Sequence, residues 1–482
     1  MLMLRLVFTG LLLLYPAWAI AASNQFVTAY KVTGDVSDGL SISDMKAIDE
    51  GLLFAGHANT SEWSYYQHAS VGLVDYKGEV VWHQRFGDIS IYEYNRVLSK
   101  VTADDKGNVF AVGTAYYGDG QRDLFMVKLT KAGSLVWQHT IDHEKTSWAG
   151  PLDIAINTDG SVALLASMGW SWCDGPCGCT SRAIYYYTLD PDTGNVISEK
   201  AVGYEGQAWF VSDGFIVALS NQANEEVPSG ILALKRYGRD GEQIWAKGYP
   251  YYTRAGETTR RYIYNNNLAV GEFDNGYVVY VGVGSVTYDY RGLLFQIDKD
   301  GKVNWMNEIA PYEYEEKNGI PGDMLVYSDG SCLLSTYIGY TSIHPILSWF
   351  NKDGTLARSL ARGDDEWAEL DQLVKLQYGV AIGGSPGKAD MSHRMMLCIF
   401  NSVPTGDICD ALGLTLNSHT FTVTPVTAVV GGTKLYPSCT FAAATVSDAE
   451  HVIATSLERL ETCTIDNLSY IADLVILLLN SP

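Results

Sequence analysis

The densest group of reactive side chains in the sequence lies in residues 170–179. Its chemically distinctive members are Trp170, Trp172, Cys173, Asp174, Cys177 and Cys179. A structural zinc site needs four thiolate or imidazole ligands, often as paired Cys-x-x-Cys units, and neither the pairing nor a nearby histidine is present. We expect instead a disulfide-stapled loop that presents the two tryptophans for binding, or packs them on a neighbouring loop.

Other patterns in the sequence predict no catalytic site. The nine histidines are scattered, and there is neither a His-Glu-x-x-His motif nor a glycine-rich phosphate loop that opens a helix. Acidic runs such as Glu315–Glu316 and Asp364–Glu366 are typical of a solvated surface. Asp298–Gly301 resembles only part of a calcium loop, without the glutamate at the twelfth position. We therefore expect no catalytic residue, no metal ligand and no cofactor.

Composition and charge exclude several classes of protein. The 482 residues are 47% hydrophobic and 18% charged, which favours a large packed core over disorder. There are 33 basic and 55 acidic residues, for a net charge of −22, so we expect no nucleic-acid partner.

The N-terminus has the pattern of a secretory signal peptide. Arg5 precedes an apolar run over residues 6–15, and two overlapping small-x-small sites follow at residues 17–21. We expect residues 1–22 to be removed and the mature protein to be secreted, periplasmic or on the cell surface. No later stretch approaches the roughly 20 apolar residues that cross a bilayer as a helix, so we expect no transmembrane segment.

In an exported protein the eight cysteines are best interpreted as structural disulfide candidates. They are Cys173, Cys177, Cys179, Cys332, Cys398, Cys409, Cys439 and Cys463. Five precede residue 407 and three follow it, so complete pairing requires at least one bridge between the C-terminal tail and the main body.

An internal repeat dominates the chain. A first turn glycine recurs at Gly51, Gly107, Gly160, Gly214, Gly276, Gly330 and Gly379. A second recurs at Gly78, Gly133, Gly194, Gly241, Gly301, Gly354 and Gly406. Each series spans 328 residues in six intervals, so both give a period of about 54.7 residues and seven copies.

Each copy carries four segments with the period-two alternation of β-strands, separated by Asp, Asn and Gly turns. Seven such antiparallel units predict an all-β fold, a seven-bladed β-propeller over residues 25–406. Residues 26–32 resemble the fourth strand at residues 80–86, so this N-terminal segment could close the ring, in competition with the segment after Gly406. Residues 407–482 change character and predict a small, partly β appendage, with one short helix over residues 448–459.

Residues 123–137 resemble the repeat of exported bacterial β-propeller proteins, in which Asp-apolar-Lys-Leu leads to a turn glycine and then a tryptophan. This resemblance implies export, a propeller fold and a binding role. A more distant similarity is to quinoprotein-like propellers, because Trp82, Trp137, Trp245 and Trp305 each follow a turn glycine by four residues. We interpret these four tryptophans as blade packing.

The two faces of such a ring must differ, because one receives the short glycine turns and the other receives longer loops. Aromatic and acidic residues are interleaved in the longer loops, which suits sugar rings or a protein surface. Our candidate ligand-binding residues are Trp63, Tyr65, Tyr66, Tyr116, Tyr117, Trp170, Trp172, Asp174, Tyr288 and Tyr290. The sequence thus favours a non-catalytic binding protein for a glycan or protein ligand. The alternatives are a quinone- or metal-dependent enzyme acting in the central channel, and a structural component of the cell envelope.

Overall fold

The computed structural model describes the strands of the chain and most of their short turns. The described residues are 26–32, 39–59, 67–87, 95–117, 121–142, 148–169, 182–204, 206–219, 231–250, 261–285, 291–310, 320–338, 344–362, 369–377, 379–385, 395–400, 406–409, 414–418, 422–425, 445–448, 452–454 and 457–464. They contain only β-strands and turns, and none of them forms a helix long and apolar enough to cross a membrane.

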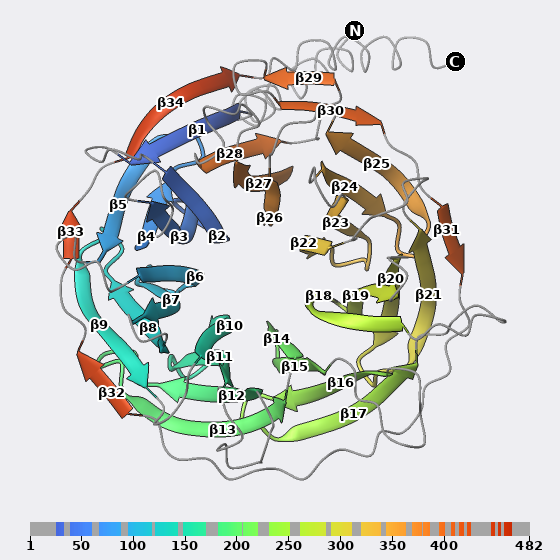
Figure 1. The fold of residues 1–482 in the computed structure, drawn as a ribbon, viewed down its shortest axis with the longest axis horizontal. Coiled ribbons are helices and arrows are strands. Elements are labelled where there is room, and N and C mark those ends of the chain that lie inside the picture. The colour runs from blue at the N-terminus through green and yellow to red at the C-terminus, as the bar shows by residue number, and fades with distance from the viewer. Residues whose placement is uncertain are drawn as a thin grey trace, which may run out of the picture.

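The strands form seven antiparallel sheets arranged radially around an axis, which confirms the seven-bladed β-propeller (Figure 1). Blade 1 is β2 (Gly39–Ile48), β3 (Gly51–Asn59), β4 (Gln67–Val74) and β5 (Val80–Phe86). Blade 2 is β6 (Asn95–Ala103), β7 (Val109–Tyr116), β8 (Arg122–Leu129) and β9 (Leu135–Asp142). Blade 3 is β10 (Trp148–Ile156), β11 (Val162–Gly169), β12 (Arg182–Leu189) and β13 (Val196–Tyr204). Blade 4 is β14 (Gly206–Val211), β15 (Gly214–Leu219), β16 (Ile231–Gly238) and β17 (Gln243–Pro250).

The other three blades follow the same plan, with the first strand innermost. Blade 5 is β18 (Arg261–Phe273), β19 (Gly276–Ser285), β20 (Arg291–Asp298) and β21 (Val303–Ala310). Blade 6 is β22 (Ile320–Val326), β23 (Cys332–Ile338), β24 (His344–Phe350) and β25 (Leu356–Arg362). Blade 7 is β26 (Glu369–Leu376), β27 (Gly379–Ser385), β28 (Met395–Phe400) and the N-terminal β1 (Phe26–Val32).

The ring is closed by the N-terminal strand. β1 pairs antiparallel with β28, with Val27 opposite Cys398, so the first strand of the chain completes the last blade. The competing segment does not take this place, because Gly406 begins β29 (Gly406–Cys409), which belongs to the sheet of blade 6. Gly406 is therefore not the seventh member of the second turn series.

The described strands of the C-terminal tail lie along the outer edges of the blades, where Figure 1 shows them in orange to red around the ring. They are β29, β30 (Leu414–Ser418) on blade 6, β31 (Thr422–Pro425) on blade 5, β32 (Thr445–Asp448) on blade 2, β33 (Val452–Ala454) on blade 1 and β34 (Leu457–Thr464) on blade 7. The short helix expected over residues 448–459 is wrong, because its described part lies in the last residue of β32, in β33 and in the first three residues of β34. The tail strands pair with the propeller instead of forming a sheet of their own.

The hydrophobic core is divided into seven clusters, each of which lies between two neighbouring blades. Between blades 2 and 3, for example, Phe110 and Met126 pack against Leu164 and Tyr185. The alternation of the strands places one set of side chains against each neighbouring blade, so the second and third strands of the blades are buried on both faces. This repetition explains why a single period runs through the sequence.

The prediction of disulfide bonds is wrong for two of the eight cysteines. Cys332 on β23 and Cys398 on β28 are free thiols buried in the inter-blade core. Burial raises the pKa of Cys332 to about 12 and also raises the pKa of Cys398, so both thiols stay protonated and unreactive. Of the other candidates, Cys409 and Cys463 lie on β29 and β34 without a described side chain. Cys173, Cys177, Cys179 and Cys439 lie outside the described residues.

The four spaced tryptophans connect neighbouring blades, consistent with their interpretation as blade packing. Each donates its indole N–H to a backbone carbonyl in the outer turn of the next blade. The pairs are Trp82 with Lys131 (3.1 Å), Trp137 with Pro191 (3.1 Å), Trp245 with Lys299 (2.8 Å) and Trp305 with Lys352 (2.9 Å). In blade 7 the hydroxyl of Tyr30 on β1 donates to the carbonyl of the turn residue Gly78 of blade 1 at 2.9 Å, as the Tyr249 hydroxyl of blade 4 does to Gly301 of blade 5 at 2.7 Å.

A turn glycine supports each of these tryptophan contacts, and Gly133 is a testable case. Gly133 has φ of +79°, and an added Cβ would lie 2.6 Å from the Trp82 ring. We expect Gly133→Ala to lower the free energy of unfolding by about 2–4 kcal/mol, from left-handed backbone strain and from displacement of the ring. Urea denaturation would measure the change.

Gly160→Ala is the matched control. Gly160 has φ of +84°, but an added Cβ there meets no atom within 4 Å, so only the backbone strain remains. Equal losses in the two variants would contradict the ring contact at Gly133.

Candidate functional site

The two faces of the propeller differ in the connections that they receive. Between β2 and β28, connections on one face contain 2–6 residues and include the glycine turns, whereas those on the other face contain 1–12 residues. We call these the short-turn face and the long-loop face. Sixteen tryptophans and tyrosines fall among the 93 connecting residues of the long-loop face, and three fall among the 52 of the short-turn face. Aromatic residues are thus concentrated in the connections of the long-loop face.

Most of the candidate ligand-binding residues lie outside the described residues. These are Trp63, Tyr65, Tyr66, Trp170, Trp172, Asp174, Tyr288 and Tyr290. The strands that flank them have their ends on the long-loop face. Their role as ligand-binding residues stays a prediction.

Tyr116 and Tyr117 are the two candidates that the structure describes, and their environments differ. Tyr116 ends β7, and the guanidinium of Arg122 lies over its ring, 4.5 Å from the centroid. Tyr117 packs against the core between blades 1 and 2, and its backbone N–H donates to the carbonyl of Gln121 at 2.9 Å. Burial, together with the carboxylate of Asp123, raises the pKa of Tyr117 to about 12. Tyr116 is therefore the better placed of the two for contact with a ligand.

A second aromatic–arginine pair lies on the same face. Trp148 begins β10 and Arg182 begins β12, and the Arg182 guanidinium lies 4.7 Å from the centroid of the Trp148 ring. The candidate residues predicted from the sequence are aromatic or acidic, so they do not include Arg122 or Arg182. The signal that could have found them is their position at the first residue of a third strand, directly after a long-loop connection.

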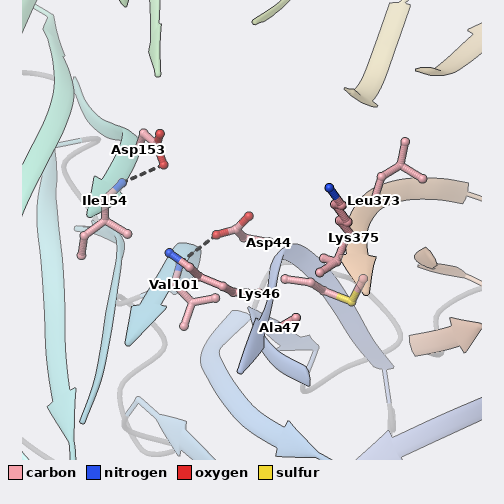
Figure 2. Close-up of a pocket in the computed structure, with 10 residues that line it drawn as sticks. Asp44, Lys46, Ala47, Val101, Asp153, Ile154, Leu373 and Lys375 are labelled. Carbon is pink, nitrogen blue, oxygen red and sulfur yellow. Dashed lines mark hydrogen bonds between the residues drawn. The ribbon is translucent and has the colours of Figure 1, made fainter. Parts of the chain in front are cut away.

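A cavity of about 370 Å³ opens around the axis, lined by residues of the inner strands of blades 1, 2, 3 and 7. Figure 2 shows Asp44, Asp153 and Lys375 on three different strands around one open space. The sequence analysis did not select these residues. Polar side chains do converge at the axis, which is the arrangement that chemistry in the channel would require.

The inner strands carry a β-bulge where these charged groups are placed. The register shifts immediately before Asp44 on β2, Lys100 on β6 and Asp153 on β10, so the three side chains occupy equivalent positions in consecutive blades. A bulge changes the direction in which a strand side chain points. The order of charges around this part of the channel is therefore acid, base, acid.

Three aspartates of the channel each connect their own blade to the next one. Asp44 Oδ2 accepts the backbone N–H of Val101 at 2.8 Å. Equivalent bonds run from Phe210 N–H to Asp153 Oδ2 at 2.7 Å and from Leu373 N–H to Asp323 Oδ2 at 2.8 Å. Because these backbone donors need partners inside the ring, the carboxylates have a clear structural role.

The electrostatics of the channel follow from this enclosure. The side chains of Asp44, Lys100, Asp153 and Asp323 keep some exposed surface in the channel, but protein surrounds them on most sides. Burial raises the pKa of Asp44 to about 6, with the Lys100 ammonium acting in the opposite direction. Burial likewise raises the pKa of Asp153 and of Asp323. The three carboxylates outweigh the effect of burial on Lys100 and raise its pKa, so Lys100 stays charged.

Other chemical patterns find little support among the described residues. No group of three or more His, Cys, Asp or Glu side chains there is arranged to hold a metal ion. Residues 383–387 have the Gly-x-Ser-x-Gly spacing of a nucleophile elbow. However, Ser385 ends β27 and pairs with Glu369 in an antiparallel blade, whereas an elbow turns from a strand into a helix.

Comparisons with known proteins show distant similarity in fold. No protein-family model and no curated protein sequence matches the chain. Quinohaemoprotein alcohol dehydrogenase ADHIIG from Pseudomonas putida HK5 is 9% identical, with a TM-score of 0.41 over 70% of this chain and 65% of that one, which is under two thirds of its length. The β-propeller domain of the trilobed protease from Pyrococcus furiosus is 9% identical, with a TM-score of 0.40 over 76% and 95% of the two chains. A protein of unknown function from Dyadobacter fermentans is 12% identical, with a TM-score of 0.39 over 62% and 93%. The chain is thus distantly similar to quinoprotein-like and other propellers.

Proposed function

We propose that this protein is an exported, non-catalytic binding protein that uses the long-loop face of its propeller to hold a glycan or protein ligand. The observation that carries the proposal is the concentration of aromatic residues in the connections of one face. Tryptophan and tyrosine combine a large apolar surface with a polar tip, which suits both sugar rings and protein hot spots.

The scaffold supports such a role. Each connection begins and ends at a strand that is hydrogen-bonded within a blade, and the indole bonds between blades add further restraint. Loops held by a rigid scaffold lose less conformational entropy on binding, so more of the contact energy contributes to affinity. The aspartates of the axial cavity are bonded to backbone amides, and this engagement favours binding at the face over chemistry at the axis.

The experiment is a glycan array and a partner capture with the mature chain, followed by affinity measurements on any ligand found. Two loop variants, Trp63→Ala with Tyr65→Ala and Tyr288→Ala with Tyr290→Ala, test the face. We expect at least one of them to weaken binding about tenfold or more, as loss of an aromatic hot spot does.

The control for this experiment is Lys106→Ala, an exposed position in a turn of the short-turn face, which should bind normally. Ligand affinity that is unchanged in both loop variants would contradict the proposal. So would the absence of any ligand in both screens.

A further inference from the structure

We propose that Tyr116, Arg122, Trp148 and Arg182 form an anion-binding site on the long-loop face, and that its ligand is a glycan bearing carboxylate or sulfate groups. We call these four residues the arginine rim. The inference rests on the proposed function and narrows its ligand from any glycan or protein to an acidic glycan.

The first half of the arginine rim lies on the side of blade 2 that faces blade 3. Thr114 and Tyr116 point to the same side of β7, and the Thr114 hydroxyl donates to the carbonyl of Ala149 on β10 at 3.2 Å. Tyr116 pairs directly with Arg122 across β7 and β8, so both side chains lie on that side. The Thr114 bond therefore fixes this half of the rim against blade 3.

The second half lies on the opposite side of blade 3. Ala149 points into the core between blades 2 and 3, so its neighbour Trp148 points the other way, toward blade 4. Trp148, Gly169 and Arg182 form one row across β10, β11 and β12, and the glycine leaves the ring and the guanidinium free to meet. The two halves thus lie on opposite sides of blade 3, at its long-loop end. One sheet layer separates them, which corresponds to roughly 10 Å.

The guanidinium groups of the arginine rim have no acidic partner among the described residues. Neither guanidinium makes a side-chain hydrogen bond or an ion pair there, although each lies over its aromatic ring. Arg236, by contrast, is buried and paired with Asp213.

These properties select the chemistry of the ligand. Contact with an aromatic ring restrains a guanidinium, so its N–H fork can bind the two oxygens of a carboxylate or sulfate with less further ordering. An aromatic ring beside each fork can cover the apolar face of a sugar ring. The net charge of −22 repels a dense polyanion such as a nucleic acid, so we assign a glycan with spaced charges.

The test compares three probes on the mature chain by calorimetry. They are an oligogalacturonate, its fully methyl-esterified form and a κ-carrageenan oligosaccharide, which carries a single sulfate per disaccharide. We expect one of the two anionic probes to bind at least about tenfold more tightly than the uncharged ester, and the preference to decrease as salt is added. The double variant Arg122→Gln with Arg182→Gln should abolish the preference.

Two further variants separate local chemistry from general charge. Arg358 lies over Trp349 at 5.4 Å on blade 6, and this pair lies toward the short-turn face, so Arg358→Gln removes the same charge and the same kind of contact elsewhere. We expect it to bind normally. Arg122→Lys with Arg182→Lys keeps both charges but loses the two parallel N–H donors of each guanidinium. We expect its affinity to lie between that of the double glutamine variant and that of the wild type. Unchanged thermal unfolding would show that the variants remain folded.

The outcomes distinguish this inference from the proposed function. A glycan that binds equally as acid and ester, insensitive to the arginine variants but sensitive to the Trp63 and Tyr65 variant, would overturn only the inference. Arginine-dependent binding of an acidic peptide such as polyglutamate, with no glycan bound, would overturn the glycan assignment. Failure to bind any glycan or protein would overturn both.

Discussion

Replacing Tyr30 with alanine is expected to lower the free energy of unfolding by about 3–5 kcal/mol, the usual cost of removing a buried aromatic side chain. Tyr30 is fully buried on β1, where it packs with the residues of the core between blades 7 and 1. Its hydroxyl also donates to the carbonyl of Gly78 in the turn of blade 1. The substitution thus weakens the contact that joins the first and last blades, and chemical denaturation would measure the loss.

Tyr30→Phe is the matched control, because it keeps the ring and removes only the hydroxyl. We expect it to cost about 1 kcal/mol, the net value of one hydrogen bond plus an unpaired carbonyl. If both variants unfolded at the wild-type denaturant concentration, the N-terminal strand would not be the closure of the ring.

The propeller could be predicted from the sequence because its determinants are local and repeated. The turn at Gly107, for example, is built within five residues: its N–H donates to the carbonyl of Asp104, and the Asp104 carboxylate accepts the N–H of Lys106 and of Asn108. A turn of this kind recurs in blade after blade, so the period can be recognised in the sequence without knowledge of contacts between distant residues. The closing strand was found in the same way, by its likeness to residues 80–86.

The course of the C-terminal tail could not be predicted, because it depends on contacts distant in sequence. β33 contains only three residues and β32 four, too few for an alternation pattern to be read. Each finds its place by pairing with an outer strand about 300 or more residues earlier, as Val452 does with Phe86. Propensity alone could not distinguish such a segment from a short helix.

The channel groups and the buried cysteines were missed or misassigned for a related reason. Asp44 and Asp153 are single acidic residues in separate repeats, and a bulge rather than a motif directs each into the channel. Compartment and number of cysteines favour disulfides, whereas Cys332 and Cys398 lie on strands that are buried on both sides, among apolar side chains of the inter-blade core.

A gain in folding stability is expected at Asp44, whose replacement by asparagine should make the protein more stable at neutral pH. Burial raises the pKa of Asp44 from 3.8 to about 6, so the folded state binds this proton more tightly than the unfolded state. Stability from this group is therefore fully present below pH 3.8 and is lost as the pH rises through 6. The difference corresponds to at most about 3 kcal/mol at pH 7 and above.

The substitution should act selectively on the charge. The side-chain carbonyl of asparagine can still accept the N–H of Val101, so the bond between blades 1 and 2 is kept. The charged groups around Asp44 include Lys100, Asp153 and Asp323, and Lys46 and Lys375 line the same cavity, so two aspartates still face these ammonium groups after the substitution. Because Asp44 keeps some exposed surface, we expect a gain of about 1–2 kcal/mol at pH 7–8, and little change at pH 4.

Urea unfolding between pH 4 and pH 8 would measure this effect, with Asp105→Asn as the control. Asp105 is exposed in a turn of the short-turn face, so its variant makes the same change in net charge away from the channel. A gain from Asp44→Asn that is independent of pH, or matched by Asp105→Asn, would show that the carboxylate is not destabilised by its place in the channel. A gain that grows between pH 4 and pH 7 would instead mean that the folded state destabilises the charged form of Asp44 by removing it from water. Asparagine has nearly the same shape and no charge, so it avoids this loss of hydration energy.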